Sequence, residues 1–171
     1  MPTTWFITGA NRGLGNEFVR QLSKDPSNHI FAAIRSMNNA GDVEKIGATN
    51  VEIVQCDICD LDSIKQVRQT LKKSLKGQSL DYLINNSGTN HSPDATILSM
   101  TLDAFQTDMS TNVWGPAKVI EELAPLMEGS KRPVIMNVTS GLGSISKSIT
   151  LGDRCPSYSI SKVRYSDNRN D

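Results

Sequence analysis

Short apolar runs alternate along the chain with segments whose apolar residues recur at the spacing of a helix. The short runs predict buried strands over residues 5–8, 29–34, 51–55, 80–85 and 133–138. The helical spacing predicts helices over residues 14–22, 37–46, 61–75 and 102–127. Strands that alternate with helices favour a parallel sheet with helices on both faces. The predicted fold class is therefore α/β, a doubly wound parallel sheet in three layers (α/β/α).

Breaks in this pattern mark the ends and interruptions of the elements. Asp60 is expected to cap the helix that begins at residue 61. Pro116 predicts a kink within 102–127, because proline is tolerated only near a helix start or at a kink. Residues 139–156 form a long loop rich in serine and glycine, a kind of loop that is usually functional or disordered. We expect one domain over 1–162 and a divergent, disordered tail over 163–171.

Composition and charge exclude several classes of function. The 171 residues carry 18 basic and 18 acidic side chains, so the chain offers no electrostatic footprint for nucleic acid or an anionic membrane. The longest apolar runs have about five residues, whereas a membrane-spanning helix needs roughly 20. The first residues form neither a basic leader nor an apolar segment. We therefore expect a soluble cytoplasmic protein that binds neither nucleic acid nor membrane.

The cysteines offer little for metal binding. Cys56 and Cys59 form a C-x-x-C pair, but a structural zinc site needs four ligands, and the histidines, His29 and His91, are isolated. An odd total of three cysteines argues against a disulfide framework. We expect no metal site.

A glycine-rich loop joins the first predicted strand to the first predicted helix. The amino terminus of a helix presents unpaired N–H groups and a partial positive charge, which bind pyrophosphate. Glycines let the chain turn sharply and let the backbone approach a ligand, although a tight structural turn would use them too. The candidate phosphate-binding residues are Gly9, Asn11, Arg12, Gly13, Leu14 and Gly15.

The spacing T-G-x-x-x-G-x-G over residues 8–15 resembles that of the short-chain dehydrogenase/reductase family rather than G-x-G-x-x-G. The resemblance implies a Rossmann-type NAD(P)-binding domain over residues 1–162. NAD-preferring members carry an acidic residue after the second strand, where this chain has Arg35. Either Arg35 or Arg12 alone is equally well explained as a solvated surface cation. Together, and without the acid, they favour NADP (NADPH) over NAD, through the adenosine 2′-phosphate.

Two further motifs follow in the order of the family. Asp57 and the backbone of Ile58 stand where the family holds the adenine, although aspartate is also common in turns. The motif over residues 85–88 reads Asn-Asn-Ser-Gly where the family has Asn-Asn-Ala-Gly. By this resemblance Asn85 braces the sheet, while Ser87 and Gly88 lie against the cofactor.

The catalytic candidates come last. Tyr158 and Lys162 form a Y-x-x-x-K motif, which places both side chains on one face of a helix. A cation near a phenol lowers its pKa from about 10, so the tyrosine becomes a better proton donor to a carbonyl oxygen. The family pattern makes Ser140, rather than Thr139, the substrate-binding hydroxyl. It also places Asn112 at a helix irregularity beside the lysine, and Tyr158 and Lys162 against the cofactor.

The resemblance implies an NADPH-dependent oxidoreductase that reduces a ketone or aldehyde to an alcohol. Arg12 and Arg35 resemble those of the carbonyl-reductase-like members, which prefer NADP. Tyr158 lies 18 positions after Ser140, a spacing similar to that of the subgroup with C-factor-like and fungal ketoreductase-like members. In the family, the helices bearing Asn112 and Tyr158 commonly form homo-oligomer contacts.

Other interpretations stay open, because family members are substantially longer and strands six and seven of the family sheet are missing. Strand five would then be an exposed sheet edge. The chain is either an oxidoreductase, a non-catalytic NADP-binding or interaction module, or a subunit that completes its sheet with another chain. A truncated gene product, inactive through truncation, is a further hypothesis.

Overall fold

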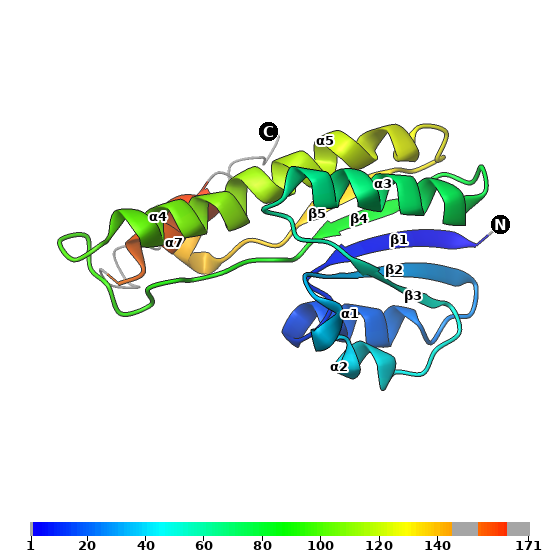
Figure 1. The fold of residues 1–171 in the computed structure, drawn as a ribbon, viewed down its shortest axis with the longest axis horizontal. Coiled ribbons are helices and arrows are strands. Elements are labelled where there is room, and N and C mark those ends of the chain that lie inside the picture. The colour runs from blue at the N-terminus through cyan, green and yellow to red at the C-terminus, as the bar shows by residue number, and fades with distance from the viewer. Residues whose placement is uncertain (1, 145–153, 164–171) are drawn as a thin grey trace.

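The computed structural model describes residues 2–144 and 154–163. Five parallel strands form one sheet in the order β3-β2-β1-β4-β5 (Figure 1). The strands are β1 (Thr3–Thr8), β2 (Asn28–Ile34), β3 (Val51–Gln55), β4 (Tyr82–Asn85) and β5 (Val134–Asn137). The chain reverses its direction of travel across the sheet after β3, which is the doubly wound topology. The predicted fold class is confirmed.

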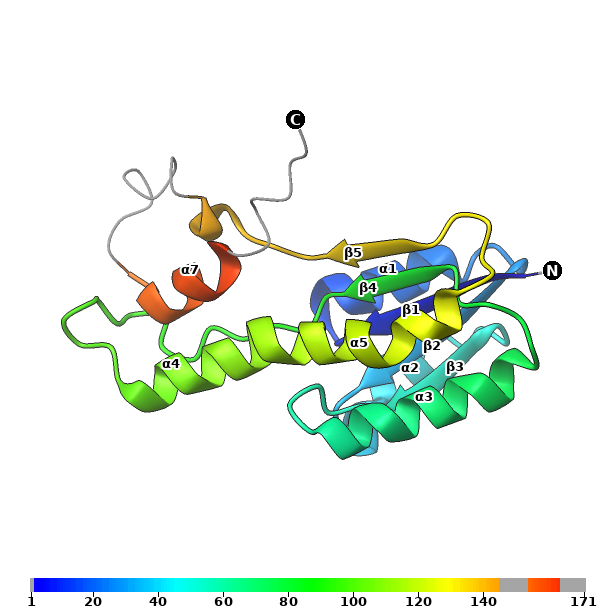
Figure 2. The same cartoon turned by 90° about the horizontal axis from the view of Figure 1, so that it is seen from above.

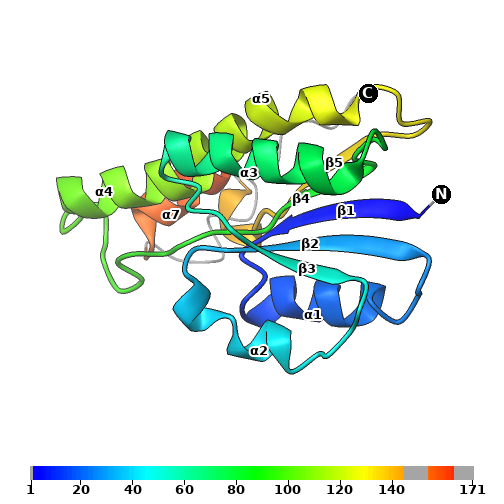
Figure 3. The same ribbon diagram turned by 45° about the vertical axis from the view of Figure 1, so that its right-hand side comes forward.

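Helices cover both faces of the sheet (Figure 3). One face carries α1 (Gly13–Leu22) and α2 (Gly41–Glu44), and the other carries α3 (Leu61–Leu75) and α5 (Gly115–Met127). The helix α4 (Leu102–Met109) continues through a π-helical turn, η2 (Ser110–Trp114), into α5. Figure 2 shows α4 reaching past the carboxyl ends of the strands, where it packs against α7 (Pro156–Val163). Two short 3-10 turns, η1 (Met37–Asn39) and η3 (Gly141–Gly143), complete the described elements.

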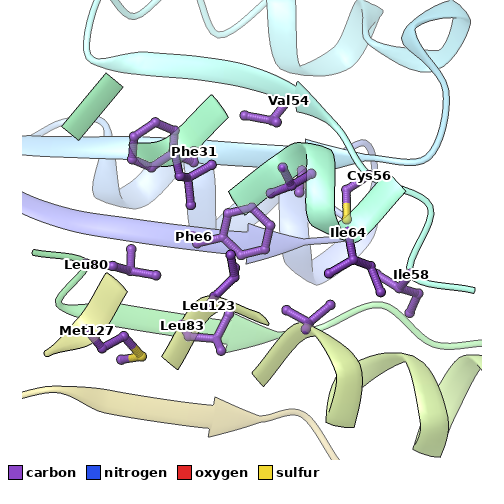
Figure 4. Packing of buried hydrophobic residues seen from close by; sticks show 14 of the residues in the cluster. Phe6, Phe31, Val54, Cys56, Ile58, Ile64, Leu80, Leu83, Leu123 and Met127 are labelled. Atoms are coloured by element: carbon purple, nitrogen blue, oxygen red, sulfur yellow. The ribbon is translucent and has the colours of Figure 1, made fainter. Parts of the chain in front are cut away.

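Alternation along the strands divides the core into two layers. Successive side chains of a strand point to opposite faces. Phe6 therefore packs beneath α3 and α5, whereas Ile7 packs against α1 and α2. The parallel register aligns Phe6 with Phe31 on one side and with Leu83 on the other, so a row of large side chains crosses the sheet (Figure 4).

Most predicted boundaries lie within two residues of those observed. The strand over 51–55 and the helix over 61–75 agree at both ends, and the Asp60 side chain caps that helix by accepting from the Asp62 N–H at 3.0 Å. The predicted helix over 37–46 is instead broken into η1 and α2. Asn38, Asn39 and Gly41 have low helix propensity, so the apolar residues at helical spacing did not suffice to form one continuous helix over 37–46.

The strand β5 forms one edge of the sheet. Val134, Ile135 and Met136 are 43%, 40% and 38% exposed, so both faces of this strand leave apolar surface uncovered. Among the described residues no helix is long and apolar enough to cross a membrane. Val163 is the last described residue of α7, and the rest of the predicted 163–171 tail lies outside the described residues, as does 145–153 of the predicted loop.

Candidate active site

The carboxyl ends of β1 and β4 are joined by a buried threonine. The Thr8 hydroxyl oxygen accepts hydrogen bonds from the Asn86 and Ser87 N–H groups, both at 3.0 Å. The Asn86 side chain donates back to the Thr8 carbonyl at 2.9 Å and to the Gly9 carbonyl at 3.3 Å. These bonds hold the start of the glycine loop against the segment that follows β4.

Gly15 allows that loop to close tightly against α1. A Cβ at Gly15 would lie 2.3 Å from the Gly9 carbonyl oxygen and 2.5 Å from the Asn86 side-chain nitrogen. Gly9 itself has a φ of +67°, which L side chains rarely adopt. Only glycine fits at these two positions without moving backbone, so the loop keeps a bare surface that a ligand can approach.

The amino terminus of α1 fits a phosphate group. Arg12 is the N-cap residue, and its side chain makes no capping hydrogen bond, so the first-turn N–H groups are left to another acceptor. Leu14 is exposed at the mouth of the loop, next to Gly13, and Asn11 is half-buried before them. The predicted phosphate-binding residues therefore lie together around one helix terminus.

Arg12 and Arg35 both have exposed side chains, and within residues 2–144 and 154–163 no carboxylate pairs with either. The Ala10 N–H donates to the Ala33 carbonyl at 3.0 Å, which places the glycine loop beside the end of β2, where Arg35 follows. The two guanidinium groups are thus available to an anion at this corner of the sheet.

Asp57 follows β3, and its side chain stabilises the turn that leads into α3. Its Oδ1 accepts from the Cys59 N–H at 2.9 Å, and its own N–H donates to the Ser63 hydroxyl at 3.0 Å. The strand order therefore sets Asp57 and Ile58, Arg35, the glycine loop, residues 85–88 and Ser140 one after another along the carboxyl edge. An extended dinucleotide has the right shape for such a row.

Lys162 is buried at the inner face of α7, only 5% exposed. Its Nζ donates to the Val138 carbonyl at 3.0 Å and lies 5.8 Å from the centre of the Tyr158 ring. Burial lowers the pKa of this ammonium group from its ordinary value of 10.5, because the charged form is poorly solvated. The structure thus brings the phenol and the amine of the Y-x-x-x-K motif together.

Asn112 lies in the π-helical turn and is fully buried. Its Oδ1 accepts from the Thr89 N–H at 2.9 Å, and its Nδ2 donates to the Thr89 carbonyl at 2.8 Å and to the Ser161 hydroxyl at 2.9 Å. A Cβ on Gly88 would lie 3.2 Å from the Asn112 Oδ1 and 3.4 Å from the Lys162 Nζ. The side chains of Asn112 and Lys162 therefore both lie against Gly88, which has no side chain to displace them.

Ser140 and Thr139 differ in how their hydroxyls are used. The Thr139 hydroxyl donates to the Lys162 carbonyl at 3.2 Å, which commits its proton to α7. The Ser140 oxygen accepts from the Leu142 N–H at 3.2 Å, so among the described contacts its own proton is left to another acceptor. Gly143, in the same turn, packs against the Lys162 backbone. These contacts favour Ser140 over Thr139 as the hydroxyl that meets a substrate.

Sequence reasoning missed several residues that build the site. Asn85 donates to the Asn137 side chain at 2.9 Å across β4 and β5, but Asn86 is the residue that clamps the glycine loop. Asp108, Ser157 and Ser161 were also missed, although each is buried beside α7. An aspartate one helical turn before Asn112 was the available signal, since a buried carboxylate needs partners.

The cysteines are free thiols. Burial raises the pKa of Cys56 to about 12, so this thiol is inert at neutral pH. Within residues 2–144 and 154–163 no group of three histidine, cysteine or acidic side chains lies close enough to hold a metal ion.

Known proteins resemble this chain in sequence and fold. The family model described as short chain dehydrogenase matches residues 3–163. The chain belongs to the short-chain dehydrogenase family. A short-chain dehydrogenase of Penicillium roqueforti is 35% identical over 145 residues, which cover 81% of this chain and 56% of that relative. An uncharacterized oxidoreductase of Schizosaccharomyces pombe is 32% identical over 150 residues, covering 85% of this chain and 58% of the relative.

Solved structures of similar proteins agree with this membership. The NADPH-bound carbonyl reductase from chicken fatty liver superposes with a TM-score of 0.86 at 28% identity, over 95% of this chain and 70% of that one. The putative carbonyl reductase Sniffer of Caenorhabditis elegans gives 0.86 at 25% identity, over 95% of this chain and 74% of that one. This short-chain dehydrogenase chain spans little more than half the length of the curated relatives above.

Proposed function

We propose that this chain acts as an NADPH-dependent carbonyl reductase, which converts a small ketone or aldehyde into an alcohol. The observation that carries the proposal is the cluster of Tyr158, Lys162 and Asn112 beyond the glycine loop, on the same edge of the sheet. The similar structure from chicken fatty liver, a carbonyl reductase with NADPH bound, supports both the cofactor and the reaction class.

The residues along the carboxyl edge fit a dinucleotide. The open N–H groups at the start of α1 and the bare surface around Gly9 and Gly15 would hold the diphosphate. Arg12 and Arg35 would pair with the 2′-phosphate, and Asp57 and the backbone of Ile58 would hold the adenine. Asn85 would brace the strands there, while Ser87 and Gly88 would lie along the cofactor toward the catalytic side chains.

When bound, the reduced nicotinamide supplies a hydride to the carbonyl carbon. The chain's own residues handle the charge that develops on the oxygen. Tyr158 donates its phenolic proton to that oxygen, and Ser140 donates a hydrogen bond to it. The ammonium group of Lys162 lies close enough to Tyr158 to stabilise the phenolate that remains. Asn112 holds the helix with Lys162 through Ser161.

The test is NADPH oxidation by the purified full chain with a panel of aldehydes, ketones and quinones. Turnover is expected, and Tyr158→Phe should lower it by roughly a hundredfold or more, since it removes the proton donor. The variant should bind NADPH as the wild type does. Activity that survives Tyr158→Phe contradicts the catalytic assignment, and binding without any turnover favours a non-catalytic NADPH-binding module.

The preference for NADPH over NADH has its own test. Replacing Arg12 and Arg35 together by alanine should weaken NADPH binding by about tenfold to a hundredfold, because charge-assisted hydrogen bonds to the 2′-phosphate are lost. NADH, which lacks that phosphate, should bind the variant as well as the wild type. The control is Arg20→Ala, an exposed arginine of α1 that pairs with Glu17. Equal losses for both cofactors, measured by fluorescence titration, contradict the assignment.

A homo-oligomer would use the outer face of the helix bearing Asn112, where Trp114 is 39% exposed beside Met109 and Val113, together with α7. The mass in solution, from light scattering, tests this.

A cytoplasmic location is supported by the three free thiols, since a reducing compartment keeps cysteines in this form.

A further inference from the structure

The helix α4 and the π-helical turn η2 form one continuous segment over 102–114, which we call the α4–η2 rod. Two sets of hydrogen bonds, one helical turn apart, connect this rod to α7. The first set is that of Asn112, which contacts Thr89 and Ser161. The second belongs to Asp108, whose Oδ1 accepts from the His91 N–H at 3.0 Å and whose Oδ2 accepts from the Ser157 hydroxyl at 2.6 Å. Each set thus links the rod to the segment after β4 and to α7.

The carboxylate of Asp108 and the side chain of Ser157 are buried, whereas His91 is exposed and contributes its backbone N–H. Asp108 is 0% exposed and Ser157 is 1% exposed. Within residues 2–144 and 154–163 no cationic side chain pairs with this carboxylate, so hydrogen bonds from an N–H and a hydroxyl compensate for its lost hydration. Burying a carboxylate costs free energy that an apolar contact would not, so its presence needs a specific explanation.

The position of the two serines supplies that explanation. Ser157 directly precedes Tyr158, and Ser161 directly precedes Lys162. One contact at Ser161 would leave α7 free to pivot about that point, whereas two contacts four residues apart fix its height and its rotation about the helix axis. The described part of the helix has eight residues, too few to be stable without tertiary contacts.

We propose that Asp108 is a positioning residue for the reaction. Through Ser157 it sets the orientation of the helix that carries Tyr158 and Lys162, and through His91 it holds the segment after β4 against the same helix. This inference rests on the proposed function of that helix, but its structural part is measurable without turnover.

The test compares three variants of the full chain. Asp108→Ala removes both contacts, whereas Asp108→Asn keeps an oxygen for the His91 N–H and a nitrogen that donates to the Ser157 oxygen. The matched control is Asp81→Ala. Asp81, like Asp108, accepts hydrogen bonds through its side-chain carboxylate, in its case three, from the Thr4 N–H and hydroxyl and from the Ser130 hydroxyl, but it lies at the amino ends of the strands. Amide hydrogen exchange over residues 156–163 and the separate values of kcat, KM and the NADPH dissociation constant are measured for each.

Asp108→Ala should speed exchange across α7 and lower kcat by about tenfold or more, with the NADPH dissociation constant unchanged, since small misplacements of catalytic groups are costly. Asp108→Asn should restore both values, and Asp81→Ala should lower the melting temperature while α7 keeps its protection. Wild-type exchange over α7 in Asp108→Ala, or an equal loss of protection in Asp81→Ala, overturns the inference. A wild-type chain without turnover refutes the proposed function, and the exchange comparison alone then decides the role of Asp108.

Discussion

At the scale of single residues, the site depends on burying groups that water would otherwise solvate. Lys162 donates to the Val138 carbonyl and is almost fully enclosed. Burial costs desolvation free energy, but it keeps the ammonium group near Tyr158 in a medium of low dielectric constant, whereas water would screen a mobile, solvated amine. The same burial makes the stability of the fold depend on pH in a way that can be measured.

Lys162→Met should reveal that dependence. Burial lowers the pKa of Lys162 below 10.5 in the folded state. Between that lowered value and 10.5 the unfolded chain holds a proton that the folded chain has lost, so the free energy of unfolding of the wild type rises with pH there. The methionine variant lacks this contribution, and the difference should grow in favour of the wild type as the pH rises. Denaturation curves at a series of pH values measure it, and parallel pH profiles would contradict the assignment.

At the scale of elements, two irregular turns position α7, the helix to which we assign the catalytic residues. The π-helical turn η2 turns Asn112 inward toward Ser161, and the 3-10 turn η3 packs against the backbone of Lys162. Both turns lie where the proposed site needs a backbone group or a side chain in a set position. Local irregularity at functional sites is common.

Gly143 tests the fit between η3 and α7. A Cβ there would lie 2.6 Å from both the carbonyl carbon and the carbonyl oxygen of Lys162, whereas a Cβ on Gly141 meets nothing within 4 Å. Gly143→Ala should therefore destabilise the fold by roughly 1–3 kcal/mol and lower kcat by about tenfold or more. Gly141→Ala, in the same turn, is the matched control and should change neither. Equal effects of the two substitutions on melting temperature and kcat would show that the contact is unimportant.

At the scale of the whole molecule, the described residues form a sheet with one well-covered half and an edge strand, β5, that leaves apolar side chains partly exposed. The side chains of β1 and β2 are mostly buried, but three consecutive apolar residues of β5 remain partly exposed. An exposed apolar edge strand is a template for pairing with another chain. We therefore expect the described fold to associate through β5.

Ile135→Lys should slow aggregation at β5, because a charged side chain on an edge strand opposes edge-to-edge pairing. Static light scattering of concentrated protein over time measures it. Leu98→Lys is the control, since Leu98 is 95% exposed but lies outside the sheet. Equal suppression by both substitutions would assign the aggregation to general surface hydrophobicity rather than to the edge.

Sequence reasoning predicted the parts of this molecule that depend on local pattern. The bounds of β3 and α3 followed from apolar periodicity and from the Asp60 cap, and the interruption near Asn112 followed from Pro116. The break at residues 37–44 was missed because two asparagines and a glycine outweighed the apolar period.

The contacts of the site depend on tertiary structure, so the sequence could not supply them. Which asparagine of the 85–86 pair clamps the glycine loop depends on how β1 and β4 end side by side. That Asp108 faces inward toward Ser157, rather than outward to water, depends on the packing of α4 against α7, which are far apart in sequence. Motif spacing identified the candidate catalytic residues but not the groups that position them.

The most direct test of the central claim follows the hydride itself. The purified chain is incubated with NADPH that carries deuterium at both positions of the nicotinamide C4 and with the aldehydes and ketones of the panel, and the alcohol product is analysed by mass spectrometry. The account predicts an alcohol with deuterium on the former carbonyl carbon for the wild type. Tyr158→Phe should bind the cofactor as well but form little or none of this deuterated alcohol. Cofactor binding without deuterated alcohol from any of these aldehydes and ketones would contradict a carbonyl-reductase role for this chain.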